Sequence, residues 1–323
     1  MANRRNFLKK TSILVGGGTL AANSSVSAVS NAFSNINAKK SFGLQTYSLT
    51  VNREDREFSS NVQGGLKRLA QMGYTTLELA GYNPSEGKIG QVSMADYKKY
   101  ADDAGLKIVS SHVGSAEGGL HTKNNLKAHL DHWKRVAEHH AAIGCKYVIQ
   151  PGQPSTRNID EVAVVGNAYN EIGKVLKEAG LIFGYHNHSY EFQRVFPGGQ
   201  MALPFGRWPY GTPEGSKIIM DGLLEVFDPS LVVFELDVYW AVMGMQDPVA
   251  WMKKYPNHIK VLHIKDVSVL GESGMMNFQK IFETAYANGI TDFFVELEYV
   301  SSGTQFEGVK GCADYLLAAN FVK

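Results

Sequence analysis

Short apolar segments alternate with longer amphipathic segments along most of this chain, from Ser41 onward. Each short segment is rich in apolar or β-branched residues and ends in polar ones, as strands of a parallel sheet do. Most of these segments lie about 30 residues apart, which is the length of one strand–helix unit. Eight strands are predicted: Gly43–Ser48, Thr75–Ala80, Lys107–His112, Lys146–Gln150, Leu181–His186, Leu231–Asp237, Ile259–Ile264 and Asp292–Glu296.

Helical patterns occupy the stretches between the predicted strands. The clearest runs from Leu126 to Ile143, where apolar residues recur three or four positions apart. Ile159–Ala179 and Phe278–Asn288 have the same period. Several helical patterns end in a glycine shortly before the next strand, a common helix stop: Gly73, Gly105, Gly144, Gly180 and Gly289.

This alternation predicts a (β/α)8 barrel, the TIM barrel. The rival is an open doubly wound sheet, but that fold usually carries a glycine-rich phosphate loop after its first strand, and Gly43–Ser48 is followed by none. Gln193–Lys217 interrupts the pattern and is rich in proline, glycine and aromatic residues. A loop of this length is either a lid over the site or a surface insertion without a role.

The first residues have the features of an export signal rather than of a fold. Arg4 and Arg5 precede an apolar, glycine-rich stretch, and the small residues around Ala28 form a cleavage pattern. The adjacent arginines resemble the twin-arginine motif. We therefore expect residues 1–36 to be a signal and linker, residues 37–323 to form the barrel, and the mature protein to be periplasmic, with no membrane anchor.

Composition excludes some functions. The chain has 323 residues and a formal net charge of +1, which gives no support to a nucleic-acid partner. Two cysteines, Cys145 and Cys312, are too few for a cysteine-built zinc site. The expected partner is a small-molecule sugar, and the sequence leaves a homo-oligomer open.

Side chains alternate between the two faces of a strand, so polar residues at the strand ends can be sorted by parity. His186 and His188 share one face, as do Glu235 with Asp237, His263 with Lys265, and Glu296 with Glu298. Barrels of this kind hold their chemistry at the carboxyl ends of the strands. We expect these side chains to meet at the barrel mouth.

So many ionisable groups cannot face a barrel interior without compensation, and a divalent cation would supply it. The predicted ligands come from four consecutive strands: His186, Asp237, His263 and Glu296. Two imidazoles and two carboxylates suit Mn²⁺, Co²⁺ or Zn²⁺ better than Mg²⁺. His188 and Glu191 are alternative ligands to His186, and a salt bridge to Lys265 is the alternative role for the carboxylates.

Such an ion would polarise a substrate carbonyl, so that a base could remove the proton from the adjacent carbon. His188 and Glu296 are the candidate bases, and Lys265 is a candidate hydrogen-bond donor to the substrate. The remaining mouth residues are predicted to bind substrate: Gln45, Glu78, His112, Gln150 and Trp240. Four histidines of the Leu126–Ile143 segment are read as surface residues: His129, His132, His139 and His140.

Motifs on strands five to eight resemble those of the xylose-isomerase-like barrel superfamily: Tyr185-His186-Asn187-His188, Glu235-Leu236-Asp237, His263-Ile264-Lys265-Asp266 and Val295-Glu296. This group of sugar phosphate isomerase/epimerase proteins includes sugar epimerases, inosose dehydratases and 3-keto-glycoside lyases. The resemblance covers the chain from about Ser41 to its end and implies a metal shell of Glu, Asp, His and Glu. The last three map onto Asp237, His263 and Glu296.

The first ligand departs from the family pattern, because His186 stands where the epimerases carry a glutamate. In those enzymes the two metal-bound glutamates act as bases on opposite faces of the substrate. The resemblance therefore leaves three functions open: an isomerase or epimerase, a lyase that eliminates a group from a keto-sugar or glycoside, and a sugar-binding barrel without catalysis. An unphosphorylated substrate is expected, because no phosphate cradle is visible and sugar phosphates are cytoplasmic.

Overall fold

The computed structural model describes residues 40–52, 56–116, 125–152, 156, 158–196 and 215–323. The chain divides into two units, Met1–Lys39 and Lys40–Lys323, and the second is the subject of this section. The predicted export signal and the boundary after residue 36 lie outside the described residues. Within these residues, no helix combines the length and the apolar character that crossing a membrane requires.

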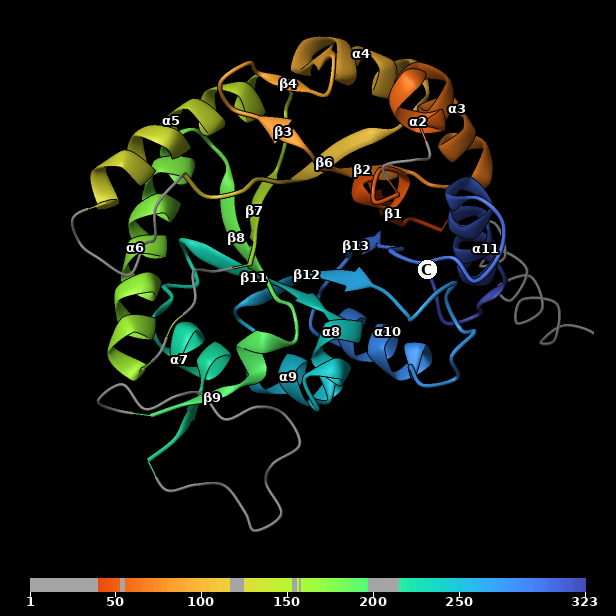
Figure 1. Cartoon of the computed structure of the whole chain (residues 1–323). Helices are drawn as coiled ribbons and strands as arrows, with labels where there is room; N and C mark the ends of the chain where they lie inside the picture. Colours follow the sequence, from red (N-terminus) through yellow and green to blue (C-terminus); the bar gives the residue numbers. More distant parts are fainter. Residues whose placement is uncertain (1–39, 53–55, 117–124, 153–155, 157, 197–214) are drawn as a thin grey trace, which may run out of the picture. The chain divides into compact units, whose positions relative to one another are not determined.

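In the described part of the chain, eight parallel strands close into a barrel in the order β1-β13-β12-β11-β8-β7-β6-β2, and β2 pairs with β1 to complete it. Helices surround these strands as a ring (Figure 1). The fold is therefore the predicted (β/α)8 barrel. The barrel strands are β1 (Gly43–Gln45), β2 (Thr76–Leu79), β6 (Lys107–His112), β7 (Tyr147–Pro151), β8 (Ile182–His186), β11 (Val232–Asp237), β12 (Ile259–Ile264) and β13 (Asp292–Val295).

The three helices with the clearest sequence pattern are confirmed. Each begins at its predicted residue and ends one residue early, and the five predicted helix-stop glycines all have positive φ angles. The helices of the described residues are α2 (Glu57–Ser60), α3 (Val62–Met72), α4 (Met94–Asp103), α5 (Leu126–Ala142), α6 (Ile159–Glu178), α7 (Ile219–Val226), α8 (Val238–Met243), α9 (Pro248–Lys254), α10 (Phe278–Ala287) and α11 (Gln305–Ala318), with 3-10 turns η2 (Thr46–Leu49) and η4 (Tyr190–Phe192).

Two small sheets lie outside the barrel and were not predicted. One is antiparallel and follows β2, with strands β3 (Tyr82–Asn83), β4 (Lys88–Ile89) and β5 (Val92–Ser93). The other pairs β9 (Arg194–Val195) with β10 (Lys217–Ile218). This second sheet joins the two ends of the predicted long loop, most of which lies outside the described residues. Both cysteines are buried and free.

The barrel interior is built in layers. The outward faces of the strands pack against the helices and form the main apolar core. The inward faces contribute a separate apolar cluster, made of Tyr147, Ile149, Val233, Val261 and Phe294. The next inward position along β11, β12 and β13 is polar in each case, so a polar layer lies on the apolar one toward the carboxyl ends of the strands.

The chain leaving β8 is fixed by a buried carboxylate. Glu191 lies in η4, is fully buried, and accepts hydrogen bonds from the Tyr185 hydroxyl and, at 2.9 Å, from the His188 backbone N–H. Burial raises the pKa of Glu191 to about 7, although these hydrogen bonds oppose the rise. The Glu191 carboxylate thus links the backbone of His188 to the Tyr185 side chain on the outward face of β8.

Close helix–barrel packing predicts a cost for adding a methyl group at Gly173. A Cβ there would lie 2.5 Å from the backbone oxygen of Leu231, an atom that cannot move without displacing the start of β11. Gly173→Ala is expected to lower the free energy of unfolding by about 1–3 kcal/mol, measured by urea denaturation. Gly114→Ala is the control, because no atom of the described residues lies within 4 Å of the added atom. Equal stability of the two variants would contradict this packing.

Glu191 predicts a pH-dependent stability difference. Its folded pKa is raised above the unfolded value, so its ionisation removes stability as the pH rises from about 4.5 through about 7. Relative to wild type, Glu191→Gln should therefore gain roughly 3 kcal/mol between pH 5 and 8, at about 1.4 kcal/mol per pKa unit. Urea unfolding of both proteins at both pH values measures this gain. Glu171→Gln, on the solvent side of α6, is the control. A pH-independent difference for Glu191→Gln would refute the assignment.

Candidate active site at the barrel mouth

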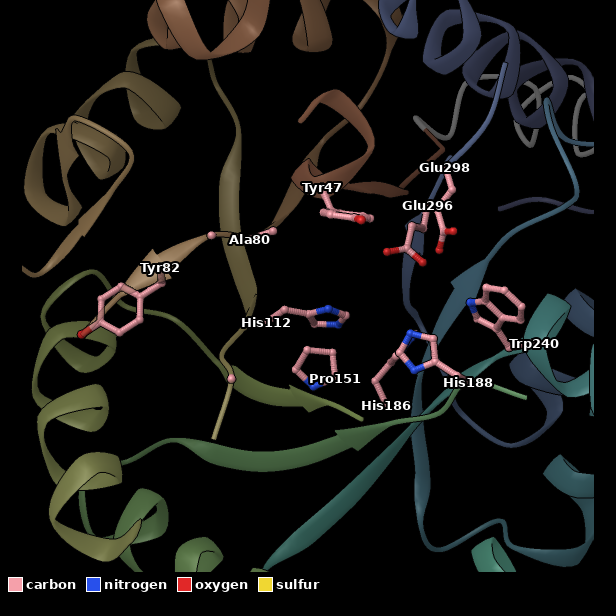
Figure 2. A pocket seen from close by; sticks show the side chains of 12 residues that line it. Tyr47, Ala80, Tyr82, His112, Pro151, His186, His188, Trp240, Glu296 and Glu298 are labelled. Carbon is pink, nitrogen blue, oxygen red and sulfur yellow. The ribbon is translucent and has the colours of Figure 1, made fainter. Parts of the chain in front are cut away.

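A cavity of about 450 Å³ opens at the carboxyl ends of the barrel strands. Figure 2 shows histidine, carboxylate and aromatic side chains around it. This volume is within the range of small-molecule sites. The lining residues are Tyr47, Ala80, Gly81, Tyr82, His112, Gly114, Pro151, His186, His188, Trp240, Glu296 and Glu298.

Strand register brings the predicted ligands together. His186 on β8 pairs with Glu235 on β11, and Asp237 pairs with His263 on β12. Glu296 directly follows β13. Because residues paired across parallel strands share a face, all these side chains enter the barrel from neighbouring strands.

The four predicted ligands form a compact cluster, which we call the mouth set: His186, Asp237, His263 and Glu296. One ligand atom from each lies within 4.8 Å of the others, and all four residues are buried. His263 Nδ1 is 3.4 Å from Glu296 Oε2 and 3.9 Å from Asp237 Oδ2. Asp237 Oδ2 has no hydrogen-bond partner in the described part of the chain. The donor set and this unpaired oxygen fit a divalent transition-metal ion.

Lys265 supplies the nearest fixed positive charge. Its Nζ atom donates to Glu296 Oε2 at 2.9 Å and to Glu298, and lies 3.9 Å from Asp237 Oδ2. Burial opposes the charge of Lys265, but these carboxylates outweigh it and raise the lysine pKa. Burial likewise favours a neutral Glu296, yet Lys265 and His263 hold the pKa of Glu296 well below its usual range.

Burial and neighbouring charges also shift the pKa values of Asp237, His188 and His186. Burial raises the pKa of Asp237 to about 6 against the pull of Lys265. Burial lowers the pKa of His188. It lowers the pKa of His186 further, with help from His263 and His112. His186 and His188 are thus favoured in the neutral form in which an imidazole accepts a proton or binds a metal.

Asn187, which lies between His186 and His188, aligns the ligand strands from behind. Its Oδ1 accepts a hydrogen bond of 3.0 Å from the Asp237 N–H, and its Nδ2 donates to the Asp237 carbonyl. The Asp237 carboxylate in turn caps α8 through the Trp240 N–H at 2.7 Å. The fixed end of β11 therefore orients both the ligand Asp237 and the cavity wall at Trp240.

The predicted site residues occupy three different environments. His112, His188, Trp240 and Glu296 line the cavity, while Lys265 lies behind its carboxylates. Gln45 and Glu78 are fully buried below the cavity, where Gln45 Nε2 donates to Glu78 at 2.8 Å. These two therefore do not contribute to the cavity wall that a substrate would touch.

The inward orientation expected for Gln150 was wrong. Its Nε2 atom donates at 2.7 Å to the Tyr169 hydroxyl of α6, in the layer between strands and helices. The register explains this, since Ile149 pairs with the inward-facing His112 and Gly184, which turns Gln150 outward. Pro151 lines the cavity instead.

The assignment of the α5 histidines to the surface was wrong for three of them. His129, His132 and His140 are buried. His140 shows the cause, because its Nε2 lies 3.0 Å from the hydroxyl of Ser111 on β6. These positions continue the apolar stripe of Trp133, Val136 and Ala137, so their helical spacing already placed them on the inner face.

Two site carboxylates, Glu235 and Glu298, were not assigned a role from the sequence. Glu298 lines the cavity, and Glu235 is fully buried beneath it. Burial and the adjacent Glu78 raise the pKa of Glu235 to about 7. Strand parity was the available signal, because Glu235 shares the face of Asp237 and Glu298 that of Glu296.

Comparison with known proteins agrees with this geometry. A solved structure of a sugar phosphate isomerase/epimerase from Parabacteroides distasonis is 46% identical, with a TM-score of 0.80, and the match covers 89% of this chain and 96% of that one. An L-ribulose 3-epimerase structure shares the fold at 14% identity and a TM-score of 0.62, over 85% of this chain and 92% of that one.

Among curated relatives, the inosose dehydratase of Geobacillus kaustophilus is 23% identical over 202 residues. The match spans 62% of this chain and 61% of that protein, which is less than two thirds of its length. The family model described as xylose isomerase-like TIM barrel matches residues 66–316. With its closed barrel and its polar mouth, this chain belongs to the xylose isomerase-like TIM barrel family.

Proposed function

We propose that this protein is a divalent-metal-dependent sugar isomerase or epimerase that removes a proton from the carbon next to a substrate carbonyl. The observation that carries the proposal is the mouth set, two of whose members, His186 and Glu296, line the cavity together with His188. When bound there, Mn²⁺, Co²⁺ or Zn²⁺ would polarise the carbonyl and make the adjacent C–H bond more acidic.

His188 is the proposed base. It lines the cavity and follows His186 by two residues, and its Nδ1 has no hydrogen-bond partner in the described residues. Its ring lies against Trp240, with 5.7 Å between the ring centroids, and parallel to Tyr190 at 5.8 Å. These contacts hold the imidazole at the wall, where it can take a proton from a bound sugar. Lys265, behind the wall, would offset the charges of Glu296 and Glu298 while negative charge develops on the substrate.

The cavity favours an uncharged sugar or keto-sugar. Its described lining contains two carboxylates, Glu296 and Glu298, and neither lysine nor arginine. Lys265, behind this wall, is already paired with both carboxylates. A phosphate group would meet this negative wall without a cation of its own. The Parabacteroides protein is called a sugar phosphate isomerase/epimerase, but for this chain we therefore expect a substrate without a phosphate group.

Elimination from a keto-sugar or 3-keto-glycoside is the second candidate. In that reaction His188 would take the proton next to the carbonyl, a carbon–carbon double bond would form, and the β-oxygen would leave with a proton as water or an alcohol. The replacement of a family glutamate by His186 favours it, because the mouth set then holds Glu296 but no second glutamate. The dehydratase activity named for the Geobacillus relative is of this type.

The metal requirement predicts the composition of the purified protein. Elemental analysis should find about one divalent ion bound through the mouth set, lost in Asp237→Ala because that residue supplies a buried carboxylate ligand. Asp292→Ala is the matched control, since this carboxylate pairs with Lys146 at the opposite end of the barrel. Unchanged metal content in Asp237→Ala would show that the ligand set is wrong.

The proton-transfer step predicts isotope exchange. Wild-type protein incubated with an inosose or a 3-keto-glycoside in D₂O should place deuterium on the carbon next to the carbonyl, followed by NMR, and His188→Ala should slow this exchange at least a hundredfold. His258→Gln, a histidine bonded to Phe227 on another part of the barrel, is the control. Full exchange in His188→Ala would eliminate it as the base. The identity of the product would then distinguish epimerisation from elimination.

A further inference from the structure

The cavity at the barrel mouth has two sides of different chemistry. The strand ends at β8, β11 and β13 supply its carboxylates, Trp240 and two of its histidines. The opposite side comes from the chain after β2 and after β6, and β2 is separated from β11 by three strands in either direction. We call the residues that line it there without a polar side chain the small-residue wall: Ala80, Gly81 and Gly114.

Tyr82 also lines this side, but its ring does not fill it. Figure 2 shows the Tyr82 side chain pointing away from His112 and Trp240. Its hydroxyl is hydrogen-bonded to His139 Nδ1 at 2.5 Å, and its ring lies edge-on to His140, with 4.7 Å between the ring centroids. Burial raises the pKa of Tyr82 to about 12, so the group stays neutral. Tyr82 therefore leaves the small-residue wall open and adds no charge to it.

The space in front of the small-residue wall is open. An added Cβ at Gly114 would have no atom of the described residues within 4 Å, and at Gly81 the nearest such atom is Ile89 Cγ2 at 4.0 Å. Gly81 has a φ of 79°, a conformation that favours glycine. The Gly114 carbonyl accepts a hydrogen bond of 3.0 Å from His132 Nε2 on α5. The wall is thus bare of side chains and held from behind.

Tyr47 borders this open side with an exposed aromatic ring. It lies in η2 after β1, its side chain is 41% exposed, and Figure 2 shows it between Ala80 and Glu296. The Tyr47 N–H donates to Gln45 Oε1 at 3.0 Å, and the Ala80 N–H donates to the hydroxyl of Thr46 at 2.9 Å. These bonds hold η2 against the end of β2. A fixed ring at this place offers a flat apolar surface to a bound molecule.

The dimensions and polarity of the cavity indicate what this side could hold. About 450 Å³ is in the range of sites for drug-sized ligands, which are larger than one sugar ring. A second ring carrying hydroxyl groups would need hydrogen-bond partners, because a buried hydroxyl without one costs free energy. The side chains of the small-residue wall offer none. An apolar group needs no such partner and gains from leaving water.

We propose that Tyr47 and the small-residue wall form a subsite for the aglycone, the non-sugar part, of a keto-glycoside, and that the preferred aglycone is aromatic. The inference rests on the proposed function, because it leaves the keto-sugar ring at the mouth set. In the elimination described above, the bond between the sugar carbon and the aglycone oxygen would break, and that oxygen would take up a proton. The aglycone would then depart from this subsite as a phenol.

The test compares phenyl and methyl 3-keto-glucosides, in both anomeric forms, by isothermal titration calorimetry. The full-length protein carries His188→Ala, which prevents turnover during the titration. The phenyl glycoside of the accepted anomer should bind roughly tenfold more tightly than its methyl counterpart. Adding Tyr47→Ala, which removes the ring, or Gly114→Leu, which fills the open space, should reduce this ratio to about twofold without weakening the methyl glycoside. Tyr299→Ala, an aromatic residue that is 59% exposed and not among the cavity-lining residues, is the control.

A phenyl preference that falls in Tyr47→Ala or in Gly114→Leu, and not in Tyr299→Ala, would support the subsite. Equal affinity for the two glycosides, binding of neither, or a preference that both substitutions leave unchanged would overturn it. Deuterium exchange of the same glycosides by wild type tests the proposed function separately. Exchange without a phenyl preference would refute the subsite alone, and a phenyl preference without exchange would refute the proposed chemistry alone.

Discussion

The burial of negative charge inside the barrel is the constraint on which the mouth depends. Four carboxylates, those of Glu78, Glu235, Asp237 and Glu296, are at most 5% exposed. An unpaired buried carboxylate costs several kcal/mol, so each needs a positive or hydrogen-bonding neighbour. Glu78 obtains it from Gln45, Ser110 and His263, and Glu296 from Lys265 and His263. Among the described residues, Glu235 Oε1 and Asp237 Oδ2 are left without a hydrogen-bond partner.

This polar layer is stable because the apolar layer beneath it is closely packed. At Gly184 on β8, a Cβ would lie 2.2 Å from Ile149 Cδ1, so the glycine makes room for the neighbouring isoleucine. Gly43 makes the same kind of room for the Phe294 ring, 2.5 Å from its added atom. The large side chains of one strand thus fill positions left open on the next, and the residues directly above, such as His186, are held at a fixed height in the barrel.

Strand parity explains which parts of the site could be predicted from the sequence. Parity predicted that the mouth set would come together, because each of its residues lies on or next to a strand where several residues of the same parity indicate the inward face. It failed at Gln150, because no other residue of that strand indicated the inward face in advance and the register with β6 decides the orientation. Two-residue strands such as β3 are too short to show a period. Depth inside the barrel, which separates Glu78 from Glu296, depends on the stagger between strands and is absent from any local pattern.

The chemical asymmetry of the mouth follows from one position. His186 stands where the family resemblance implies a glutamate, so the two sides of the cavity differ. On one side, His186 at the end of β8 and His188 just after it are kept neutral by burial, and His188 Nδ1 has no hydrogen-bond partner in the described residues. On the other side, three strands farther around the barrel, Glu296 is held as a carboxylate by Lys265. A lysine that stabilises the carboxylate also makes it a weaker base, so Glu296 is poorly suited to return a proton to the opposite face of a substrate. A barrel in which one candidate base is unpaired and the other is held in an ion pair favours a reaction in which the proton is removed once and a leaving group departs. This connects the buried charge pattern to the elimination chemistry proposed as the second candidate.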